Sequence, residues 1–236
     1  ELMTIRAKEI GLKSSNFTNS TGWPDPEHKM SSKDIVTLAN KIREEYPSYY
    51  RIFDDLEFTW DNISQKNRNP LLFMNLGADG LKTGYTEEAG YGLIASVKQN
   101  KRRVTFVITG LNSAEQRARE AKGITTWAFK KFKLKTYFKK NSIILEAPVW
   151  RGKKESVKIS ATNDVQILLA SDAKEGTQIQ IVLKEPLVAP LKKGKKINGH
   201  LVIKTTPLAK TGVEKRQLIF PIEVGEDLER GGLANK

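Results

Sequence analysis

The sequence predicts two domains, an α/β (α+β) domain over residues 1–135 and a small all-β domain over residues 136–224. The length of 236 residues suits two domains of ordinary size. The first part combines helical periodicity with two apolar strand runs, whereas the second contains only short runs, several of alternating polarity, separated by turn residues. The polar, glycine-containing segment 225–236 is expected to be a disordered tail.

Capping and breaking residues place two helices at the start of the first domain. Residues 1–10 have the character of a helix that Gly11 stops at its C-cap. Ser31 or Ser32 can cap a second helix with apolar residues at helical spacing, which ends by Tyr46 because a proline follows.

A hairpin and a long helix complete the first domain. Residues 91–97 and 104–109 are continuous apolar runs joined by a short polar turn, so we expect two paired strands with both faces covered. Ser113 and Gln116 fit a capping box that opens a helix running to about Phe132.

In the second domain, short strands are predicted at residues 157–160, 165–169, 178–183, 200–205 and 217–222.

Composition excludes several classes of site. The chain has no cysteine, which excludes disulfides and thiolate chemistry, and its two histidines, His28 and His200, are far apart and outside any recognisable triad context. We therefore expect no metal and no cofactor. The formal charge of +13 favours a polyanionic neighbour such as nucleic acid, anionic lipid or an acidic cell-wall polymer. No run of 18 apolar residues is present to span a bilayer.

The most informative motif is Lys82-Thr83-Gly84, within the stretch from Asp79 to Thr86. Alone it is weak, but here it directly precedes the predicted hairpin and long helix, which is the context of the third motif in penicillin-recognising serine enzymes. The flanking residues resemble those of the D-alanyl-D-alanine carboxypeptidases, the low-molecular-mass penicillin-binding proteins of peptidase S11 type. They are Ser32-x-Asp34, Tyr46-Pro47, Phe58-Thr59, Asn67-Arg68-Asn69, Arg117, Thr126-Trp127 and Pro148-Val149-Trp150.

This resemblance implies a fold and a reaction. The first domain is expected to be a penicillin-binding-protein and β-lactamase-like transpeptidase domain, incomplete at its N-terminus, and the second a sandwich-like accessory domain. A serine would attack the penultimate D-Ala carbonyl, release the last D-Ala and leave an acyl-enzyme for water to hydrolyse. Lys82 would hold the electrostatics of the site, and the backbone N–H of Tyr85 would form half of the oxyanion hole.

Substrate-binding residues follow from the same resemblance. The Thr83 hydroxyl would bind the terminal carboxylate of the substrate, Gly84 would leave room for the peptide, and Thr86 and Arg117 would complete the subsite. Arg119 is the competing candidate for Arg117. The segment Asn67-Arg68-Asn69 is interpreted as turn and packing residues beneath the site.

Two other motifs of the family are expected upstream of Glu1, namely Ser-x-x-Lys with the nucleophile and Ser-x-Asn. The sequence Ser171-Asp172-Ala173-Lys174 is rejected as their equivalent because it follows Lys82 and falls in a turn of the β domain. Ser14-Ser15-Asn16 is rejected because its loop matches another part of the family. We therefore predict that this chain alone is inactive and acts with a missing N-terminal segment.

The implied partners are the peptidoglycan stem peptide, β-lactams and that N-terminal segment, with an anionic membrane surface as a further candidate and no nucleic acid. The implied location is periplasmic or extracytoplasmic, at the outer face of the cytoplasmic membrane. Two alternatives stay open: a related β-lactamase, endopeptidase or transpeptidase, and a non-catalytic basic protein that binds cell wall or nucleic acid.

Overall fold

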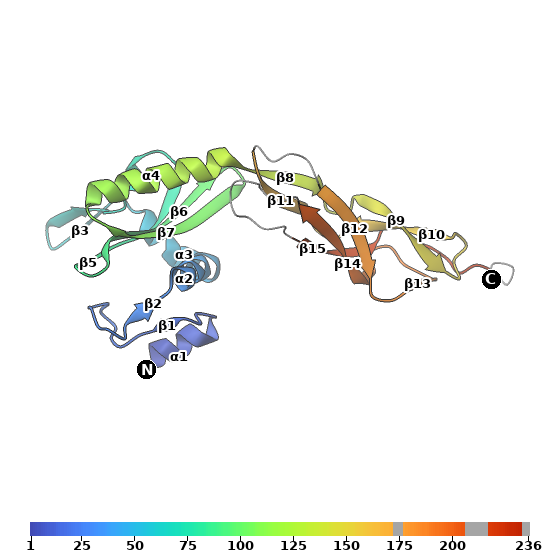
Figure 1. Ribbon diagram of the computed structural model, residues 1–236, viewed down its shortest axis with the longest axis horizontal. Coiled ribbons are helices and arrows are strands. Elements are labelled where there is room, and N and C mark those ends of the chain that lie inside the picture. The colour runs from blue at the N-terminus through green and yellow to red at the C-terminus, as the bar shows by residue number, and fades with distance from the viewer. Residues whose placement is uncertain (172–176, 206–216, 233–236) are drawn as a thin grey trace. The chain divides into compact units, whose positions relative to one another are not determined.

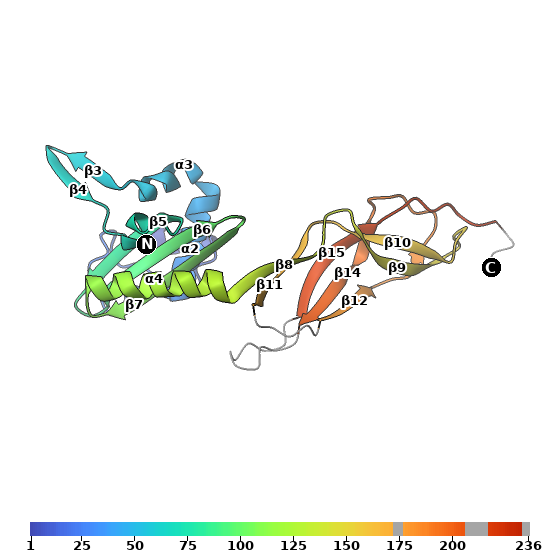
Figure 2. The ribbon, with the colours of Figure 1, turned by 90° about the horizontal axis from the view of Figure 1, so that it is seen from above.

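A computed structural model describes residues 1–171, 177–205 and 217–232 of the chain. These residues form two compact units, Glu1–Lys130 and Lys131–Lys236 (Figures 1 and 2). The elements of the first unit are α1 (Leu2–Glu9), β1 (Ser15–Asn16), β2 (Lys29–Met30), α2 (Ser32–Glu45), α3 (Pro47–Tyr50), η1 (Arg51–Asp54), β3 (Glu57–Trp60), β4 (Ile63–Lys66), η2 (Pro70–Phe73), β5 (Ala78–Thr86), β6 (Gly90–Gln99), β7 (Arg102–Leu111) and α4 (Ala114–Lys131).

The centre of the first unit is an antiparallel sheet of order β5-β6-β7. In Figures 1 and 2, α4 covers one face of this sheet and α2 lies on the other. Side chains alternate along β6, so that Leu93 and Val97 pack with Ala121 of α4, while Ile94 packs with Ala39 of α2. Both faces of the hairpin are therefore covered, as its continuous apolar runs predicted.

Side-chain caps fix where the two main helices begin. Ser31 caps α2, since its Oγ accepts a hydrogen bond of 3.2 Å from the backbone N–H of Asp34. At α4, the Ser113 Oγ accepts a bond of 3.1 Å from the Gln116 N–H. The Gln116 Oε1 in turn accepts one of 2.9 Å from the N–H of Asn112, so the predicted capping box forms with its return bond one residue earlier.

The first thirty residues are tied to the start of α2. The buried carboxylate of Asp34 accepts hydrogen bonds of 2.7 Å from the Ser14 N–H and from the Ser15 hydroxyl. The bond from Ser15 is the main cause of the lowered pKa of Asp34. Gly11, at φ +92°, ends α1 as the sequence predicted.

The second unit is entirely β. Its elements are β8 (Phe132–Phe138), β9 (Ile143–Trp150), β10 (Ser156–Ala161), β11 (Val165–Ala170), β12 (Thr177–Leu183), β13 (Leu187–Val188), β14 (Lys196–Thr205) and β15 (Gln217–Val224). A six-stranded sheet of order β12-β14-β15-β10-β9-β13 stands beside the pair β11-β8. Val165 and Ile167 of the pair share one core with Ile159, Leu201 and Ile203 of the larger sheet, which gives a sandwich-like arrangement.

Strands β8 and β9 were not predicted from the sequence. In β8, Lys133 and Lys135 are exposed on the same side of the strand, because residues two apart point the same way. These two lysines therefore belong to a regular strand and not to a loop.

The segment expected to be a disordered tail is ordered as far as residue 232. Leu228 is only 4% exposed, and its backbone N–H and C=O each bond to Leu191 at 2.9 Å. The Gly231 N–H also donates to the Arg151 carbonyl at 2.9 Å. One apolar side chain and several backbone bonds thus hold a stretch of polar composition, while residues 233–236 lie outside the described part.

Among the described helices, none is long and apolar enough to cross a membrane.

Candidate functional site

The predicted motif lies on an edge strand. Lys82, Thr83 and Gly84 are in the middle of β5, which pairs only with β6 in the described parts of the chain. A Cβ placed on Gly84 would meet no atom within 4 Å. The free edge of β5 therefore offers unpaired backbone groups and open space to an extended peptide.

A polar network fixes the start of β5 below the motif. Both carboxylate oxygens of Asp79 accept bonds of 2.6 Å from the guanidinium of Arg103, and Oδ1 accepts a further bond of 2.9 Å from the Tyr50 hydroxyl. Arg103 also donates to the Ser96 Oγ at 2.6 Å. Burial would raise the pKa of Asp79, but the bonds from Arg103 and Tyr50 outweigh it and hold that pKa below its ordinary value.

The segment Asn67-Arg68-Asn69 braces the same strand from the side. Asn69 is fully buried and donates through Nδ2 to the Gly80 carbonyl at 3.0 Å, while its Oδ1 accepts from the Leu71 N–H at 3.1 Å. The Asn67 Oδ1 accepts a bond of 2.9 Å from the Asn69 N–H. Two asparagines thus fix the backbone on either side of Arg68.

A cavity of about 690 Å³ opens beside the free edge of β5. It is lined by Arg68, Lys82, Thr83, Gly84, Tyr85, Tyr91, Ala114 and Arg117. Three of the lining residues are cationic and none is a carboxylate. A cavity with this lining favours an anion, above all a carboxylate or a similar planar group.

Arg117 is the most buried of the three cations, at 8% exposed, and lies in the first turn of α4. Its Nη2 donates to the Arg68 carbonyl at 3.3 Å, and its guanidinium lies 5.7 Å from the centre of the Tyr91 ring. Its buried Nε has no hydrogen-bond partner within the described structure. The competing candidate Arg119 is largely exposed and pairs with Glu120 at 3.5 Å, so Arg117 is the arginine of the cavity.

The pKa of Lys82 is lowered by its surroundings. Partial burial of its ammonium group lowers its pKa, and the positive charges of Arg68 and Arg117 lower it further. Its Nζ donates to the carbonyl of Thr83. A lysine with a lowered pKa beside an anion site can both bind an anion and take part in proton transfer.

The cavity brings together five of the six predicted site residues. Thr86 is not among them, since its Oγ1 accepts a bond of 3.0 Å from the Ala89 N–H and closes the turn after β5. Sequence reasoning missed Arg68 as a site residue because its asparagine neighbours suggested a packing turn. Its positive charge, which a packing turn does not require, is the signal that could have identified it.

None of the described residues of the two rejected serine motifs lines this cavity. The Ser15 hydroxyl is engaged with Asp34, and Asn16 donates to the Glu27 carbonyl at 2.8 Å. Ser171 belongs to the second unit, and the rest of its motif, residues 172–176, lies outside the described residues. Within residues 1–171, 177–205 and 217–232, no three His, Cys, Asp or Glu side chains are grouped to hold a metal ion.

Two family models match this chain in succession. Residues 1–113 match the family described as D-alanyl-D-alanine carboxypeptidase, peptidase S11. Residues 132–226 match the C-terminal domain of penicillin-binding protein 5. The first match lies within the first unit and the second match within the second unit.

Curated relatives of this chain carry the name of the same family. The chain is 33% identical over 235 residues to D-alanyl-D-alanine carboxypeptidase DacC of Escherichia coli, covering 98% of this chain and 56% of that protein. It is 34% identical over 200 residues to DacA of Haemophilus influenzae, covering 84% and 51%. The chain thus spans about half the length of these relatives.

Two solved structures extend the comparison. Penicillin-binding protein 5 of Haemophilus influenzae superposes with a TM-score of 0.75 at 30% identity, over 97% of this chain and 65% of that one. Penicillin-binding protein D2 of Listeria monocytogenes, solved in a cefotaxime-bound form, matches with a TM-score of 0.50 at 28% identity, over 55% of this chain and 54% of that one.

Proposed function

Because the chain belongs to the D-alanyl-D-alanine carboxypeptidase family, peptidase S11, we propose that it forms one wall of the active site of a serine-type enzyme that trims the terminal D-Ala from peptidoglycan stem peptides. The observation that carries this proposal is the cationic cavity on the free edge of β5. A peptide that ends in a carboxylate can lie along this edge with its terminal charge among the three cations.

In this arrangement, Thr83 and Arg117 hold the substrate carboxylate. The Thr83 hydroxyl donates one hydrogen bond, and the unpartnered Nε of Arg117 supplies another from a nearly buried position. Gly84 leaves room for the peptide backbone. Arg68 adds positive charge at the side of the cavity and lowers the pKa of Lys82.

The chemical step is acyl transfer. A serine Oγ bonds to the penultimate D-Ala carbonyl carbon, the C–N bond to the last D-Ala breaks, and the released amine takes a proton. The Tyr85 backbone N–H stabilises the negative charge that develops on the carbonyl oxygen. Lys82 supports proton transfer through a serine of the second motif.

The nucleophile is proposed to come from outside these 236 residues. The one Ser-x-x-Lys sequence in the chain begins at Ser171, in the β unit, whereas Lys82 and its cavity are in the first unit. On this view the chain alone is inactive and needs an N-terminal segment that carries the serine and its lysine.

The proposal includes β-lactams as ligands. Penicillin-binding protein D2 has been solved with cefotaxime and with ampicillin bound. A β-lactam carries a carboxylate next to its reactive carbonyl, so it suits the same cationic cavity and would acylate the serine covalently.

We also propose a location outside the cytoplasm, at the outer face of the cytoplasmic membrane. Residues 131–236 contain 21 Lys and Arg against 11 Asp and Glu, a formal charge of +10 out of the total of +13. A β unit with this excess would be attracted to an anionic membrane surface or an acidic cell-wall polymer.

Peptide binding tests the proposal without requiring the nucleophile. We expect acetyl-Ala-D-Ala-D-Ala to shift the amide resonances of Thr83, Gly84 and Tyr85 in the isotope-labelled chain. Its C-terminal amide should bind at least about fivefold more weakly, because it lacks the charge that the cations bind. Equal affinity for acid and amide would refute a carboxylate site here.

Intact-protein mass tests the position of the nucleophile. Incubation with benzylpenicillin is expected to leave the mass of this chain unchanged. A chimera that adds the preceding half of the Escherichia coli relative should gain one penicillin. An adduct at Ser171 in the chain alone would contradict the proposal.

A further inference from the structure

The largest sheet of the second unit ends at strand β12, and this edge is long and uncharged. The sheet has the order β12-β14-β15-β10-β9-β13, so β12 and β13 are its two outer strands. The pairing of β12 with β14 runs without a register shift from Thr177 to Leu183. None of the residues of β12 is charged, although charged residues make up 28% of the chain.

The backbone of β12 has a row of free hydrogen-bonding groups. The Lys184 N–H, one residue beyond the strand, donates to the Asn198 carbonyl of β14 at 2.9 Å. Main-chain groups alternate in direction along a strand, so those of the even-numbered residues point toward β14. The N–H and C=O groups of the odd-numbered residues from Thr177 to Leu183 therefore point away from the sheet. Within the described parts of the chain, β12 pairs with β14 alone.

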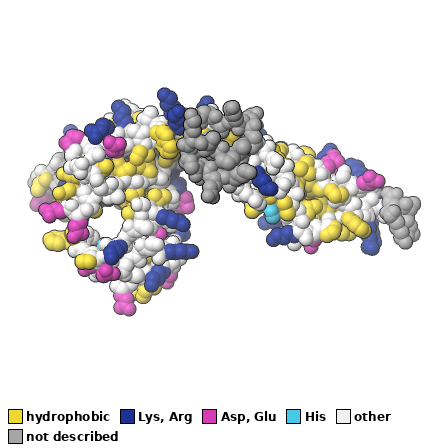
Figure 3. Space-filling view, viewed as in Figure 1, with side chains coloured by type: hydrophobic (Ala, Val, Ile, Leu, Met, Phe, Trp, Pro, Cys, Tyr) yellow, Lys and Arg dark blue, Asp and Glu magenta, His cyan; other side chains and the backbone are white. Residues whose placement is uncertain are grey.

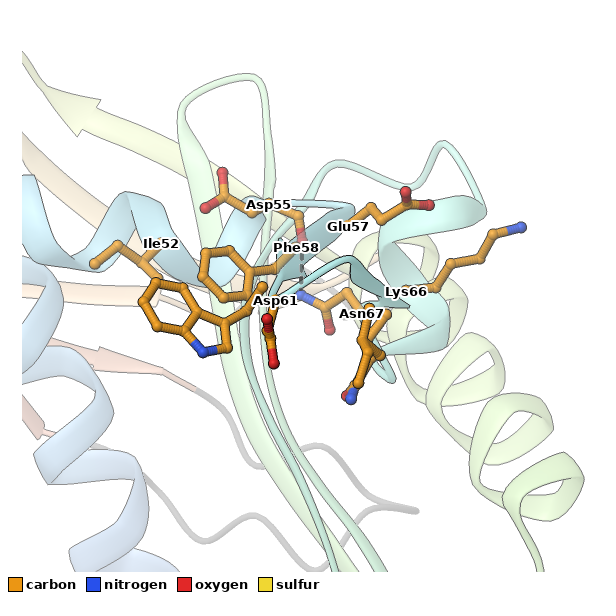
Figure 4. Close-up of a pocket in the computed structure, with 10 residues that line it drawn as sticks. Ile52, Asp55, Glu57, Phe58, Asp61, Lys66 and Asn67 are labelled. Atoms are coloured by element: carbon orange, nitrogen blue, oxygen red, sulfur yellow. Dashed lines mark hydrogen bonds between the residues drawn. The ribbon is translucent and has the colours of Figure 1, made fainter.

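Several other strand edges of this protein have features that discourage pairing. Strand β13 has only two residues and lies between Pro186 and Pro190. The hairpin β3–β4, beside the pocket drawn in Figure 4, has the charged residues Glu57 and Lys66 opposite each other at its open end. Strand β8 exposes Lys133, and β11 pairs with β8 through a register shift. Short length, proline, charge and bulges protect edges in natural sheets, and β12 has none of these features.

The lack of charge suits this edge to a second copy of the same chain. With a formal charge of +13, two copies repel each other as whole molecules. The side chains of β12 that face away from the core are Gln178, Gln180 and Val182, all of them exposed. An antiparallel contact between two such strands places no like charges opposite each other. Two cationic molecules can therefore approach along β12.

We propose that two copies of this chain pair through β12, antiparallel about a two-fold axis at Gln180, so that their six-stranded sheets join into one continuous sheet. Gln180 is the middle residue of the strand, and any other register leaves residues at the strand ends unpaired. Ile179 exchanges main-chain bonds with Ile181 of the second copy, and Thr177 with Leu183, which gives about eight hydrogen bonds in all. This inference does not depend on the proposed function.

The side chains fit this register. Ile179 shares the core-facing side of β12 with Ile181, which packs against the hydrophobic cluster of the second unit, yet Ile179 is itself 39% exposed. In the dimer, Ile179 lies opposite Ile181 of the second copy, so the contact removes apolar surface from water. On the other face, the two Gln180 side chains meet at the axis, where each amide can donate to the other.

The contact is small, which sets the strength expected of the dimer. Two strands of this length bury less surface than a standard protein interface, so we expect a dissociation constant on the order of 100 µM. Sedimentation velocity on the full 236-residue chain measures it. Most chains should be dimeric at about 1 mM and monomeric at about 10 µM.

A charge placed at the axis tests the position of the contact. In Gln180→Lys the two introduced charges face each other, so the dimer should be at least about fivefold weaker. Gln65→Lys, at an exposed position of β4 in the first unit, adds the same charge and is the control. It should leave the dissociation constant within about twofold. Circular dichroism establishes that both variants are folded.

Cysteine substitutions test the register, because the chain has no cysteine of its own. Gln180→Cys places two thiols in a non-hydrogen-bonded pair, where Cα atoms are about 4.5 Å apart and a disulfide can form. Gln178→Cys, on the same exposed face, is the matched control, since its two thiols are four residues apart along the strands, about 13 Å. With oxidised glutathione, Gln180→Cys should form linked dimers at least about tenfold faster. A mixture of Gln178→Cys and Val182→Cys should also form linked dimers.

The outcomes are distinct. A chain that stays monomeric at about 1 mM overturns the inference. A dimer that Gln180→Lys leaves unchanged also overturns it, because the copies then meet elsewhere. Equal rates of linkage for Gln180→Cys and Gln178→Cys have the same meaning, since they indicate random collision. None of these results changes the proposed function, which peptide binding tests separately.

Discussion

Single residues that do not line the cavity decide how its wall is held. Tyr50, Asp79 and Arg103 form a bonded group at the start of β5, three residues before Lys82. They hold in place the strand that carries Lys82, and rigid support of a site residue matters as much as the residue itself. The group is also titratable, which makes its role measurable.

The first prediction concerns Tyr50. Burial, and then the negative charge of Asp79, raise its pKa from 10.0 to about 12. The folded protein therefore keeps this proton at a pH where the unfolded chain loses it, so stability falls as pH rises from 10 to about 12 and is fully present below 10. Tyr50→Phe should flatten this part of the pH dependence of the free energy of unfolding, measured with urea. Parallel curves for the two proteins would contradict it.

Asn69 gives a second prediction at this scale. Asn69→Ala leaves the Gly80 carbonyl and the Leu71 N–H unpaired in a fully buried place, so we expect a loss of about 3 kcal/mol in the free energy of unfolding. The exposed Asn163→Ala is the control and should change stability by less than about 0.5 kcal/mol. A near-neutral Asn69→Ala would mean that the segment around Arg68 does not depend on these bonds.

At the scale of the element, β5 combines a buried and an open side. Its residues Leu81 and Thr83 are buried, while Lys82, Gly84 and Tyr85 are exposed along the free edge. A sheet edge left open in this way is a liability unless a ligand or another segment uses it. On the proposed function, Gly84 keeps this edge open for the peptide.

Two glycines of the β5–β6 pair, Gly84 and Gly90, distinguish a functional from a structural need for glycine. Gly84→Ala should leave stability within about 0.5 kcal/mol, because its Cβ meets no atom, yet weaken D-Ala-D-Ala peptide binding about tenfold by occupying ligand space. Gly90→Ala should destabilise the protein by at least about 1 kcal/mol, since Gly90 is at φ +63° and its Cβ would lie 2.7 Å from the Leu111 carbonyl. Thermal melts and peptide titrations separate the two effects. Unchanged peptide affinity in Gly84→Ala would remove the open edge of β5 from the site.

At the scale of the whole molecule, each unit has its own hydrophobic core. Leu93 lies in a cluster of the first unit and Leu201 in the cluster of the second. On the face visible in Figure 3, Lys and Arg side chains occur at several separate places on both units. Several lysines of the second unit are paired, including Lys153 with Glu229 and Lys158 with Glu226, so part of its excess charge is locally balanced.

Separate cores predict separate unfolding transitions. Leu93→Ala and Leu201→Ala each remove a fully buried side chain and should cost about 2–5 kcal/mol. In differential scanning calorimetry, we expect each variant to lower a different transition of the same chain. If both variants shift one common transition, the two units unfold as one cooperative body.

The sequence alone determined much of this protein. Helix caps such as Ser113, the helix-ending Gly11 and the hairpin over residues 91–109 follow local rules that act over a few residues, and the structure has them where they were predicted. The motif with its flanks also identified the family, because spacing along the chain is all that such a signature requires.

Only the tertiary structure decided which side chains share the cavity. Arg68, Lys82 and Arg117 are far apart in sequence and meet because η2, the sheet and α4 pack around one hydrophobic cluster. In the second unit, packing against a different cluster buried Leu228 within a segment of polar composition. Local periodicity carries no information on such contacts, since they depend on how whole elements fit together across the core.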